Sequence, residues 1–246
     1  MAERVFTQRR DWRTAFVALR RLLADGNDTA QVFRIMRALN VGTARRNYHR
    51  LLETAAGGRI AFRRIELSQR LTDPRFVQGF AAGTVGAAYA DFLATTGYSA
   101  DGLAEVSRTD LTSIDIEHPY AWFGRRERDI HDLWHVLTGY KADEQAGEAC
   151  LVAFSYAQTR GLGWAFIAFG AALKELRFSH GRAFARAVWE GYRHGRSAAW
   201  LSGEDYEALL AEPIGGARVR LNIAEPVAYQ KFQALVAARA PQLRTA

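Results

Sequence analysis

Cysteine is almost absent from this sequence, since Cys150 is the only one among 246 residues. An intramolecular disulfide needs two cysteines, and the common structural zinc sites need two or more thiolates, so the sequence excludes both. A chain of this kind suits a reducing compartment. We therefore expect the protein to be cytoplasmic.

Long apolar runs are also missing. The longest strongly apolar stretch, Gly161–Leu173, has thirteen residues, whereas a helix that spans a bilayer needs roughly 20. The N-terminal residues 1–23 are basic and lack the apolar core and small-residue cleavage site of a secretory signal. We expect no transmembrane segment, and we interpret the apolar stretch as a buried helix.

Lysine is scarce, because only Lys141, Lys174 and Lys231 are lysines among 33 cationic residues. With 26 acidic residues the net charge is +7, which can attract nucleic acids, anionic lipids or phosphorylated ligands, or can serve solubility alone. No helix-turn-helix pattern, RNA-binding aromatic strand or zinc-finger spacing is present, so we expect no nucleic-acid partner. An anionic membrane surface is the better functional interpretation.

Helical periodicity dominates what is present. In residues 14–25, for example, Phe16, Leu19 and Leu23 recur at the three- and four-residue spacing of an apolar helix face. Helices are predicted over residues 14–25, 28–40, 44–55 and 84–97, and over the central motif, where Gly139 and the polar residues after it break the helix. A long apolar helix to about residue 176 follows the motif, and further helices are predicted over about 181–195, 203–211 and 227–240. Gly57 and Gly58 are expected to end the third helix, and residues 99–120 to form a short helix and a loop. We predict one all-α domain over residues 1–246, with residues 1–10 as a flexible arm.

The central motif is "HDLWH", residues 131–135, followed by Glu148. On a helix, His135 lies about 40° from His131 and Asp132 about 100° from it, so all three share one face. Imidazoles four residues apart can bind one cation, and a carboxylate from the next helix, Glu148 or Glu144, can join them. Two histidines with carboxylates and no thiolate suit zinc, iron, cobalt or manganese and leave a coordination position open for chemistry.

Two other interpretations of the motif remain open on spacing alone. The histidines could be ordinary hydrogen-bonded residues of a helix, packed beside Trp134 and Leu137. They could also belong to an HD-type phosphohydrolase, whose metal site needs an upstream histidine and a downstream aspartate. His118 and Asp205 are the available residues, although their sequence contexts are weak.

Taken together, several segments resemble a bacterial member of the coenzyme Q (ubiquinone) biosynthesis protein 4 family. The hallmark of that family is an HDxxH helix followed by Gly-Glu, matched here by His131, Asp132, His135 and the pair Gly147-Glu148. The segments "NDTAQVFRIMRALN", "GTVGAAYADFL", "LVAFSYAQTRGLG" and "DYEALLAEPIGGARVRLNI" are also similar to family segments and occur in the same order. One departure is that twelve rather than eleven residues separate the second histidine from the glutamate, which we place as an insertion in "YKADEQAG". We choose Glu148 over Glu144 because it follows Gly147.

The resemblance implies an all-α protein with a metal site beside an apolar cavity, bound peripherally to the inner face of the cell membrane. It implies a lyase that removes the ring C1 carboxylate of a polyprenylated hydroxybenzoate, coupled in some descriptions to oxidation. The metal, most simply Zn²⁺, would be held by His131, His135, Asp132 and Glu148, with Asp132 alternatively a catalytic acid. Expected partners are the quinone precursor, other ubiquinone biosynthesis proteins, the anionic membrane and a second copy in a homodimer. The alternative is a lipid-binding scaffold that presents the precursor without reacting.

Several side chains are candidates for binding the two ends of such a ligand. The aromatic and aliphatic residues after Glu148 can form either core or the lining of a prenyl cavity; they are Phe154, Trp164, Phe166, Ile167 and Phe169. Candidate headgroup contacts are Arg128, Tyr156, Arg160, Arg193, His194 and Arg196. The sequence alone does not decide between these roles and ordinary packing or surface ion pairs.

Overall fold

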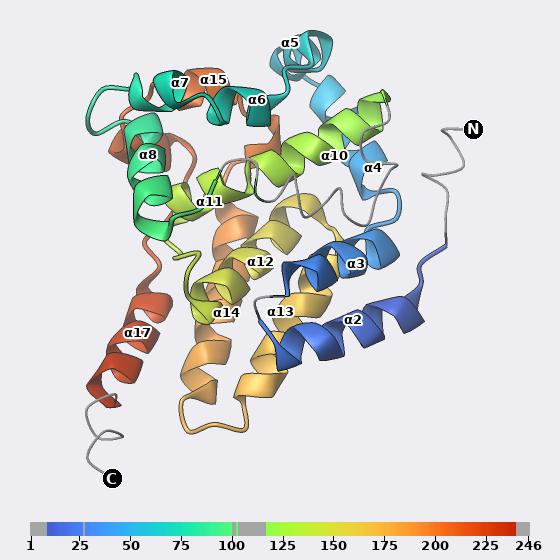
Figure 1. The fold of residues 1–246 in the computed structure, drawn as a ribbon, viewed down its shortest axis with the longest axis vertical. Helices are drawn as coiled ribbons and strands as arrows, with labels where there is room; N and C mark the ends of the chain where they lie inside the picture. The colour runs from blue at the N-terminus through green and yellow to red at the C-terminus, as the bar shows by residue number, and fades with distance from the viewer. Residues whose placement is uncertain (1–8, 27, 100–101, 103–116, 240–246) are drawn as a thin grey trace.

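Amphipathic periodicity produces helices along nearly the whole described chain. The computed structural model describes residues 9–26, 28–99, 102 and 117–239, which form one all-α domain (Figure 1). The helices are α2 (Trp12–Ala24), α3 (Thr29–Leu39), α4 (Thr43–Leu52), α5 (Ala55–Arg63), α6 (Leu67–Leu71), α7 (Pro74–Gln78), α8 (Val85–Thr96), α10 (Pro119–Asp129), α11 (His131–Thr138), α12 (Gln145–Thr159), α13 (Leu162–Glu175), α14 (Gly181–Ser197), the 3₁₀ turn η1 (Leu201–Gly203), α15 (Tyr206–Leu209), α16 (Ile214–Arg220) and α17 (Val227–Arg239). Extended pairing in these residues is limited to one isolated bridge between Thr84 and Pro213.

Helix α12 forms the centre of the domain, because side chains on all of its faces are buried. Its main partner is α14, and two small residues allow the two backbones to approach closely. A Cβ atom on Gly191 would lie 2.4 Å from the carbonyl oxygen of Cys150, and one on Gly195 would lie 2.5 Å from that of Phe154. The two glycines are four residues apart on α14, and the two carbonyl oxygens that they approach are four residues apart on α12. This matched spacing fixes how α14 lies on α12.

Helices α2 and α3 pack as a pair against α13 and close one side of the domain (Figure 1). Helix α2 begins at a capping residue, since the carboxylate of Asp11 accepts a hydrogen bond from the backbone N–H of Thr14 at 3.0 Å. It buries its small and aliphatic face, including Ala15 and Leu19, and leaves aromatic residues on the outside.

Helices α10 and α11 run one after the other across α12 and carry the central motif. Helix α10 contacts α4 and α6, whereas α11 contacts α8 and α16. The C-terminal end of α11 is held by Arg218, which donates hydrogen bonds to the carbonyl oxygens of Leu137 at 2.9 Å and Val136 at 3.1 Å. These carbonyls would otherwise lack intrahelical partners.

Three of the expected helix boundaries are wrong. The long helix predicted up to about residue 176 is two helices, because Arg160 adopts a left-handed conformation (φ 58°) and ends α12. Gly57 and Gly58 do not end α4 but lie inside α5; Gly57 is required there because its Cβ would meet the carbonyl oxygen of Leu51 at 1.9 Å. The loop expected before the motif gives way to helix α10, which starts at Pro119.

Most of the short helix predicted after Ser99 lies outside the described residues, and so does most of the predicted arm, residues 1–10. Within the described part of the chain, no helix combines the length and the apolar character needed to cross a bilayer.

Candidate metal centre

The end of helix α11 orients the second histidine of the motif. Gly139 adopts a left-handed conformation (φ 77°) and its N–H donates to the carbonyl oxygen of His135 at 2.9 Å. This turn brings the carbonyl oxygen of Tyr140 to 2.7 Å from Nδ1 of His135. Because a carbonyl oxygen can only accept, Nδ1 carries the proton and Nε2 of the neutral ring is left with a free lone pair.

The carboxylate comes from the first turn of helix α12. Glu148 is the fourth residue of that helix, and Gly147 before it allows the turn to lie directly against the chain at Lys141. A Cβ atom on Gly147 would lie 2.0 Å from the carbonyl oxygen of Lys141. The Gly-Glu pair thus has a physical reason, since glycine permits the close approach that aims the glutamate at α11.

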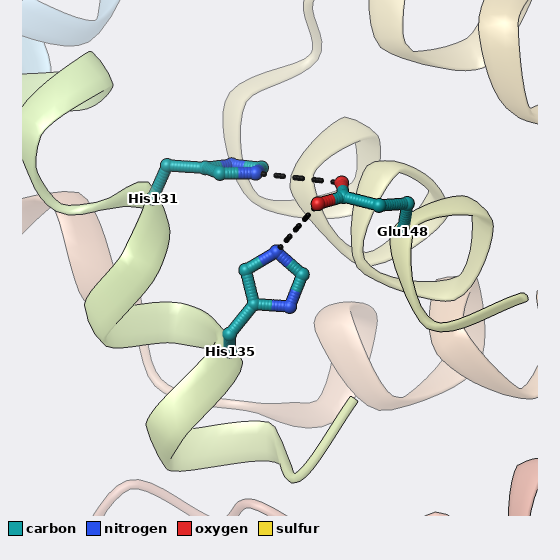
Figure 2. A group of neighbouring side chains, drawn as sticks. All are labelled: His131, His135 and Glu148. Atoms are coloured by element: carbon teal, nitrogen blue, oxygen red, sulfur yellow. Dashed lines mark ion pairs between the residues drawn. The ribbon is translucent and has the colours of Figure 1, made fainter. Parts of the chain in front are cut away.

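Figure 2 shows both histidines projecting from α11 toward the carboxylate of Glu148 on the facing helix. Nε2 of His135 lies 3.2 Å from Oε1 of Glu148, and Nε2 of His131 lies 3.7 Å from Oε2. One ligand atom from each residue can be chosen so that all three lie within 4.8 Å of one another. Such a triangle can hold one metal ion.

The hydrogen bonding of His135 supports a cation at this position. Its Nε2 atom is buried and has no hydrogen-bond partner among the described residues, although the side chain is only 1% exposed. That lone pair faces a carboxylate oxygen, so two electron-rich atoms oppose each other unless a proton or a metal ion lies between them. The donor set therefore fits a divalent metal on the evidence of its own geometry.

Electrostatics couple the three groups strongly. Burial would raise the pKa of Glu148, but the adjacent His135 and His131 outweigh burial and lower it. Burial would likewise lower the pKa of His135, but the negative charge of Glu148, 3.2 Å from Nε2, and the hydrogen bond to the carbonyl oxygen of Tyr140 outweigh burial and raise it. The carboxylate is thus ionised at neutral pH, as a metal ligand must be.

Aromatic rings fix the orientation of both imidazoles. The ring of His131 stacks on that of Trp164, with centroids 5.8 Å apart and planes 5° apart. The ring of His135 stacks on Phe92 at 6.1 Å and 16°. The two histidine rings are perpendicular to each other, at 5.0 Å and 88°.

Asp132 lies beside these groups but is not one of the three. It is buried in the first turn of α11, and burial raises the pKa of its carboxyl, while His131 and His135 act to lower it. The structure thus brings together three of the four predicted ligands. The roles of Asp132 as a ligand or as a catalytic acid stay predictions.

The other carboxylates and the third histidine considered from the sequence are engaged elsewhere. Glu144 accepts hydrogen bonds from Tyr229 at 2.7 Å, Gln233 at 2.8 Å and Lys141 at 3.0 Å, so Glu148 is the carboxylate beside the histidines. His118 and Asp205 act as helix caps, at the starts of α10 and α15 respectively. Neither completes an HD-type metal site.

A large cavity opens beside the three groups. Its volume is about 1180 Å³, and both His131 and Glu148 line it, as does Asp132. Its apolar lining comes from α2, α3, α12, α13 and α14: Leu22, Leu23, Val32, Phe33, Met36, Val152, Trp164, Ile167, Ala171 and Phe184. The volume exceeds the several hundred Å³ that hold most small ligands.

The structure separates the candidate lining residues that the sequence left undecided. Trp164 and Ile167 line the cavity, whereas Phe154 is wholly buried in the core. Phe166 contacts Trp12 and Phe16 of α2, and Phe169 is 67% exposed.

Of the six candidate headgroup residues, only Arg128 lines the cavity. Its guanidinium also forms a buried ion pair with Asp129 at 2.6 Å.

Sequence reasoning missed Glu127, a half-buried carboxyl group on the cavity wall. The one signal for it is spacing, since Glu127 precedes His131 by four residues. This spacing is informative only if residues 119–129 form a helix that leads into the motif. The partners of Glu127 come from distant segments and have no sequence signature.

Comparisons with known proteins agree with the geometry. The sequence model of the family described as "Coenzyme Q (ubiquinone) biosynthesis protein Coq4" matches residues 15–227. A mitochondrial ubiquinone biosynthesis protein COQ4 homolog from Nematostella vectensis is 32% identical over 145 residues, which cover 57% of this chain and 66% of that protein. The mitochondrial coq4 protein of Pyrenophora tritici-repentis is 30% identical over 182 residues, 72% of this chain and 58% of that protein. The matches thus span less than two thirds of these relatives' lengths.

A solved structure has the same fold. It is a protein from Nostoc punctiforme PCC 73102 whose name assigns it to ubiquinone biosynthesis, with a TM-score of 0.63 and 19% sequence identity. The superposition covers 88% of this chain and all of that one. The family match over most of the chain, the shared fold and the facing histidine and glutamate side chains lead to one conclusion: this chain belongs to the Coenzyme Q (ubiquinone) biosynthesis protein Coq4 family.

Proposed function

We propose that this protein is a metal-dependent lyase that removes the ring C1 carboxylate of a polyprenylated hydroxybenzoate during ubiquinone biosynthesis, with or without coupled oxidation. The observation that carries the proposal is the position of the His131–His135–Glu148 group, two members of which, His131 and Glu148, line a large apolar cavity. A polar reaction centre at the side of an apolar chamber suits a ligand with a polar ring and an apolar tail.

A divalent ion held by these three residues, most simply Zn²⁺ with iron, cobalt or manganese as alternatives, would stabilise negative charge on the substrate oxygens. The chain's own residues would bind and orient the aromatic ring of the substrate. Trp164 and Phe92 hold the imidazoles in place, and the aliphatic residues of α3 and α13 exclude water from the tail. Asp132, buried on the same wall with a raised pKa, is suited to donate or accept a proton there.

The alternative is a scaffold that binds the precursor and presents it to other ubiquinone biosynthesis proteins. The cavity alone is compatible with that role. A scaffold needs no open coordination position, and a site closed by four protein ligands would favour it. The candidate metal group has three residues, with Asp132 outside it. It would therefore leave a coordination position open, which favours the lyase instead.

We also propose that the protein binds the inner face of an anionic membrane, from which such a precursor would be drawn. Helices α2 and α13 support this proposal, because each contributes residues to the cavity lining and also exposes large apolar residues at the surface. The exposed set is Trp12, Phe16, Phe169 and Leu173. Helix α2 carries three arginines and no acidic residue. A homodimer stays a further prediction.

The test of the lyase is direct. Metal-loaded protein is incubated with a prenylated 4-hydroxybenzoate, and mass spectrometry follows the loss of carbon dioxide. Asp132→Asn keeps the shape of the side chain but removes its proton transfer, so turnover should fall by roughly 10² while ligand binding changes little. Binding without any turnover in the native protein would instead support the scaffold.

A further inference from the structure

Glu127 is a carboxyl group in an unusual setting. It projects from α10, lines the cavity and is half-buried. Its Oε1 atom accepts hydrogen bonds from Nδ2 of Asn47 at 3.1 Å and from Oγ of Ser202 at 3.3 Å. In the described part of the chain no cationic side chain forms an ion pair with it within 4.0 Å. A carboxylate withdrawn from water without a cation is costly to keep ionised.

The charged groups near Glu127 are bound to other atoms. Arg46 on α4 donates to the hydroxyl of Thr43 and to the carbonyl oxygen of Arg160, at 3.5 Å and 3.4 Å. Arg126 on α10 donates to the carbonyl oxygen of Glu204. Burial raises the pKa of Glu127 to about 7, and the hydrogen bonds and the two arginines offset only part of this effect.

Glu127 also shares a wall of the cavity with the metal group. Tyr120, Gly124, Glu127 and His131 follow one another at four-, three- and four-residue spacing, and all four line the cavity. Figure 1 shows α10 leading directly into α11. Among the described residues, no atom lies within 4 Å of the position that a Cβ on Gly124 would take, one turn before Glu127. A ligand headgroup at His131 therefore has room to extend toward Glu127.

We propose that Glu127 accepts the proton of a phenolic hydroxyl when an aromatic headgroup enters the cavity, an inference that rests on the proposed hydroxybenzoate substrate. The O–H bond of the phenol breaks and its electron pair stays on the phenolate oxygen. The proton bonds to a carboxylate oxygen of Glu127. No other reactant is required. A carboxylate withdrawn from water, with a pKa near neutral pH, suits this proton transfer. A phenolate directs electron density toward the ring carbon that bears the carboxylate.

The experiment measures ionisation of a bound probe and needs no turnover. The probe is a geranyl-substituted 4-hydroxybenzoate, whose phenolate absorbs at a longer wavelength than its phenol. Bound to the native protein at about pH 7.5, it should show the phenolate band. In Glu127→Gln, which retains an oxygen for Asn47 and Ser202, the phenolate fraction should fall by about tenfold, equivalent to one pKa unit. The matched control is Glu144→Gln, which should leave the band unchanged.

A second probe and a second measurement distinguish loss of the proton acceptor from a change in the structure of the cavity. The methyl ether of the same probe has no phenolic proton, so it should bind the native protein and Glu127→Gln equally. In ¹³C NMR of native protein labelled at its glutamate carboxyls, one carboxyl should titrate at about pH 7 and shift with the phenolic probe but not with the ether.

The proposal is overturned if the probe fails to bind native protein, if no phenolate band forms, if Glu127→Gln keeps the full band, or if no glutamate titrates near neutrality. The lyase is judged separately. Carbon dioxide release with an unchanged band in Glu127→Gln rejects the role of Glu127 alone, whereas a phenolate band without release rejects the lyase and keeps the proton acceptor.

Discussion

At the scale of single residues, the chemistry of the site depends on a main-chain atom. The carbonyl oxygen of Tyr140 fixes the proton of His135 on Nδ1 and leaves Nε2 available to a cation. Substitution of the Tyr140 side chain removes no atom of this hydrogen bond. The ligand orientation therefore depends on the Gly139 turn rather than on a replaceable side chain.

The first prediction concerns metal content. Protein purified without chelator should contain about one divalent metal ion per chain by elemental analysis. His131→Ala and His135→Ala should each abolish it, because each removes one corner of the three-residue group. Glu148→Gln should weaken binding far more than Glu144→Gln, since the carboxylate of Glu144 is held by Tyr229 and Gln233.

Circular dichroism of each variant provides the control, because a lost fold would also lose the metal. Full retention of metal in folded His131→Ala and His135→Ala would reject the site. A larger loss in Glu144→Gln than in Glu148→Gln would reject the choice of carboxylate.

Glu127 should make the folding free energy depend on pH in an unusual direction. Its pKa is about 7 in the folded protein against an ordinary 4.5, because of burial. Between these values the folded state holds a proton that the unfolded state has released, so this contribution to stability falls as pH rises from about 4.5 to 7 and is constant above. The full effect is on the order of 3 kcal/mol.

Glu127→Gln cannot ionise, so its stability relative to the native protein should increase over the same pH range. Urea unfolding of both proteins at about pH 4.5, 6 and 8 measures the difference, and other titrating groups cancel in the comparison. Parallel stability curves for the two proteins would show that Glu127 titrates normally.

The grouping of the two histidines could be predicted from sequence because an i, i+4 pair on a helix has a fixed geometry. The structure places Glu148, and not Glu144, beside them, and Gly147 has a local steric role in this arrangement; that these residues bind a metal stays a prediction. Glu127 could not be predicted, because its pKa depends on Asn47 and Ser202, which are far away in the sequence. The stacking of Trp164 on His131 likewise depends on how α13 packs.

At the scale of helices, close backbone contacts position the groups that matter. Gly147 lets the first turn of α12 lie against Lys141, with only 2.0 Å between its Cβ position and a carbonyl oxygen. Gly147→Ala should therefore destabilise the protein by about 1–3 kcal/mol and shift Glu148, lowering metal affinity as well. Denaturant unfolding and elemental analysis measure the two effects.

Gly124→Ala is the matched control for that prediction. It also lies within a helix, but in the part of the chain that the structure describes no atom lies within 4 Å of its Cβ position. The lower conformational entropy of alanine should stabilise the protein by about 0.5–1 kcal/mol. Equal effects of the two substitutions would mean that the contact at Gly147 is unimportant.

The presence of a helix could be predicted from apolar periodicity, whereas the residues at which helices end often could not. The predicted helices over residues 14–25, 28–40 and 84–97 correspond to α2, α3 and α8. The break between α12 and α13 was missed because Arg160, not a glycine, takes the left-handed conformation there. Tertiary packing selects that conformation, and a local pattern does not reveal it.

At the scale of the whole molecule, one surface combines apolar side chains with positive charge. The outer face of α2 and α13 exposes Phe169 by 67% and Leu173 by 58%. The adjacent exposed arginines are Arg9, Arg10, Arg13, Arg20 and Arg21. The same two helices line the cavity, so this surface would place the cavity close to a lipid layer.

The fourth prediction tests this surface with vesicles of phosphatidylcholine with and without phosphatidylglycerol. Binding should require the anionic lipid and weaken in high salt, because each arginine contributes on the order of 1 kcal/mol. Phe169→Glu should weaken binding at least about tenfold, since it replaces an exposed aromatic side chain that would insert among the lipids with a charge. Vesicle sedimentation measures both effects.

Phe62→Glu is the control, because Phe62 is 89% exposed on α5, at the opposite end of the molecule from α2 (Figure 1). It should bind vesicles like the native protein. Equal loss in both variants would indicate nonspecific charge repulsion. Loss of self-association in Phe169→Glu without any change in vesicle binding would assign the surface to a second copy of the chain.

The two histidines and Glu148 come from one uninterrupted stretch, residues 131–148, whereas the cavity walls come from segments spread between Leu22 and Phe184. The entropy lost in closing a loop grows with its length, so bringing these three groups together costs little. The candidate metal group is therefore a local feature of helices α11 and α12, whereas the apolar cavity depends on how distant helices pack. Changes in α2 and α3 are thus expected to alter the shape of the cavity and to leave the three facing side chains in place.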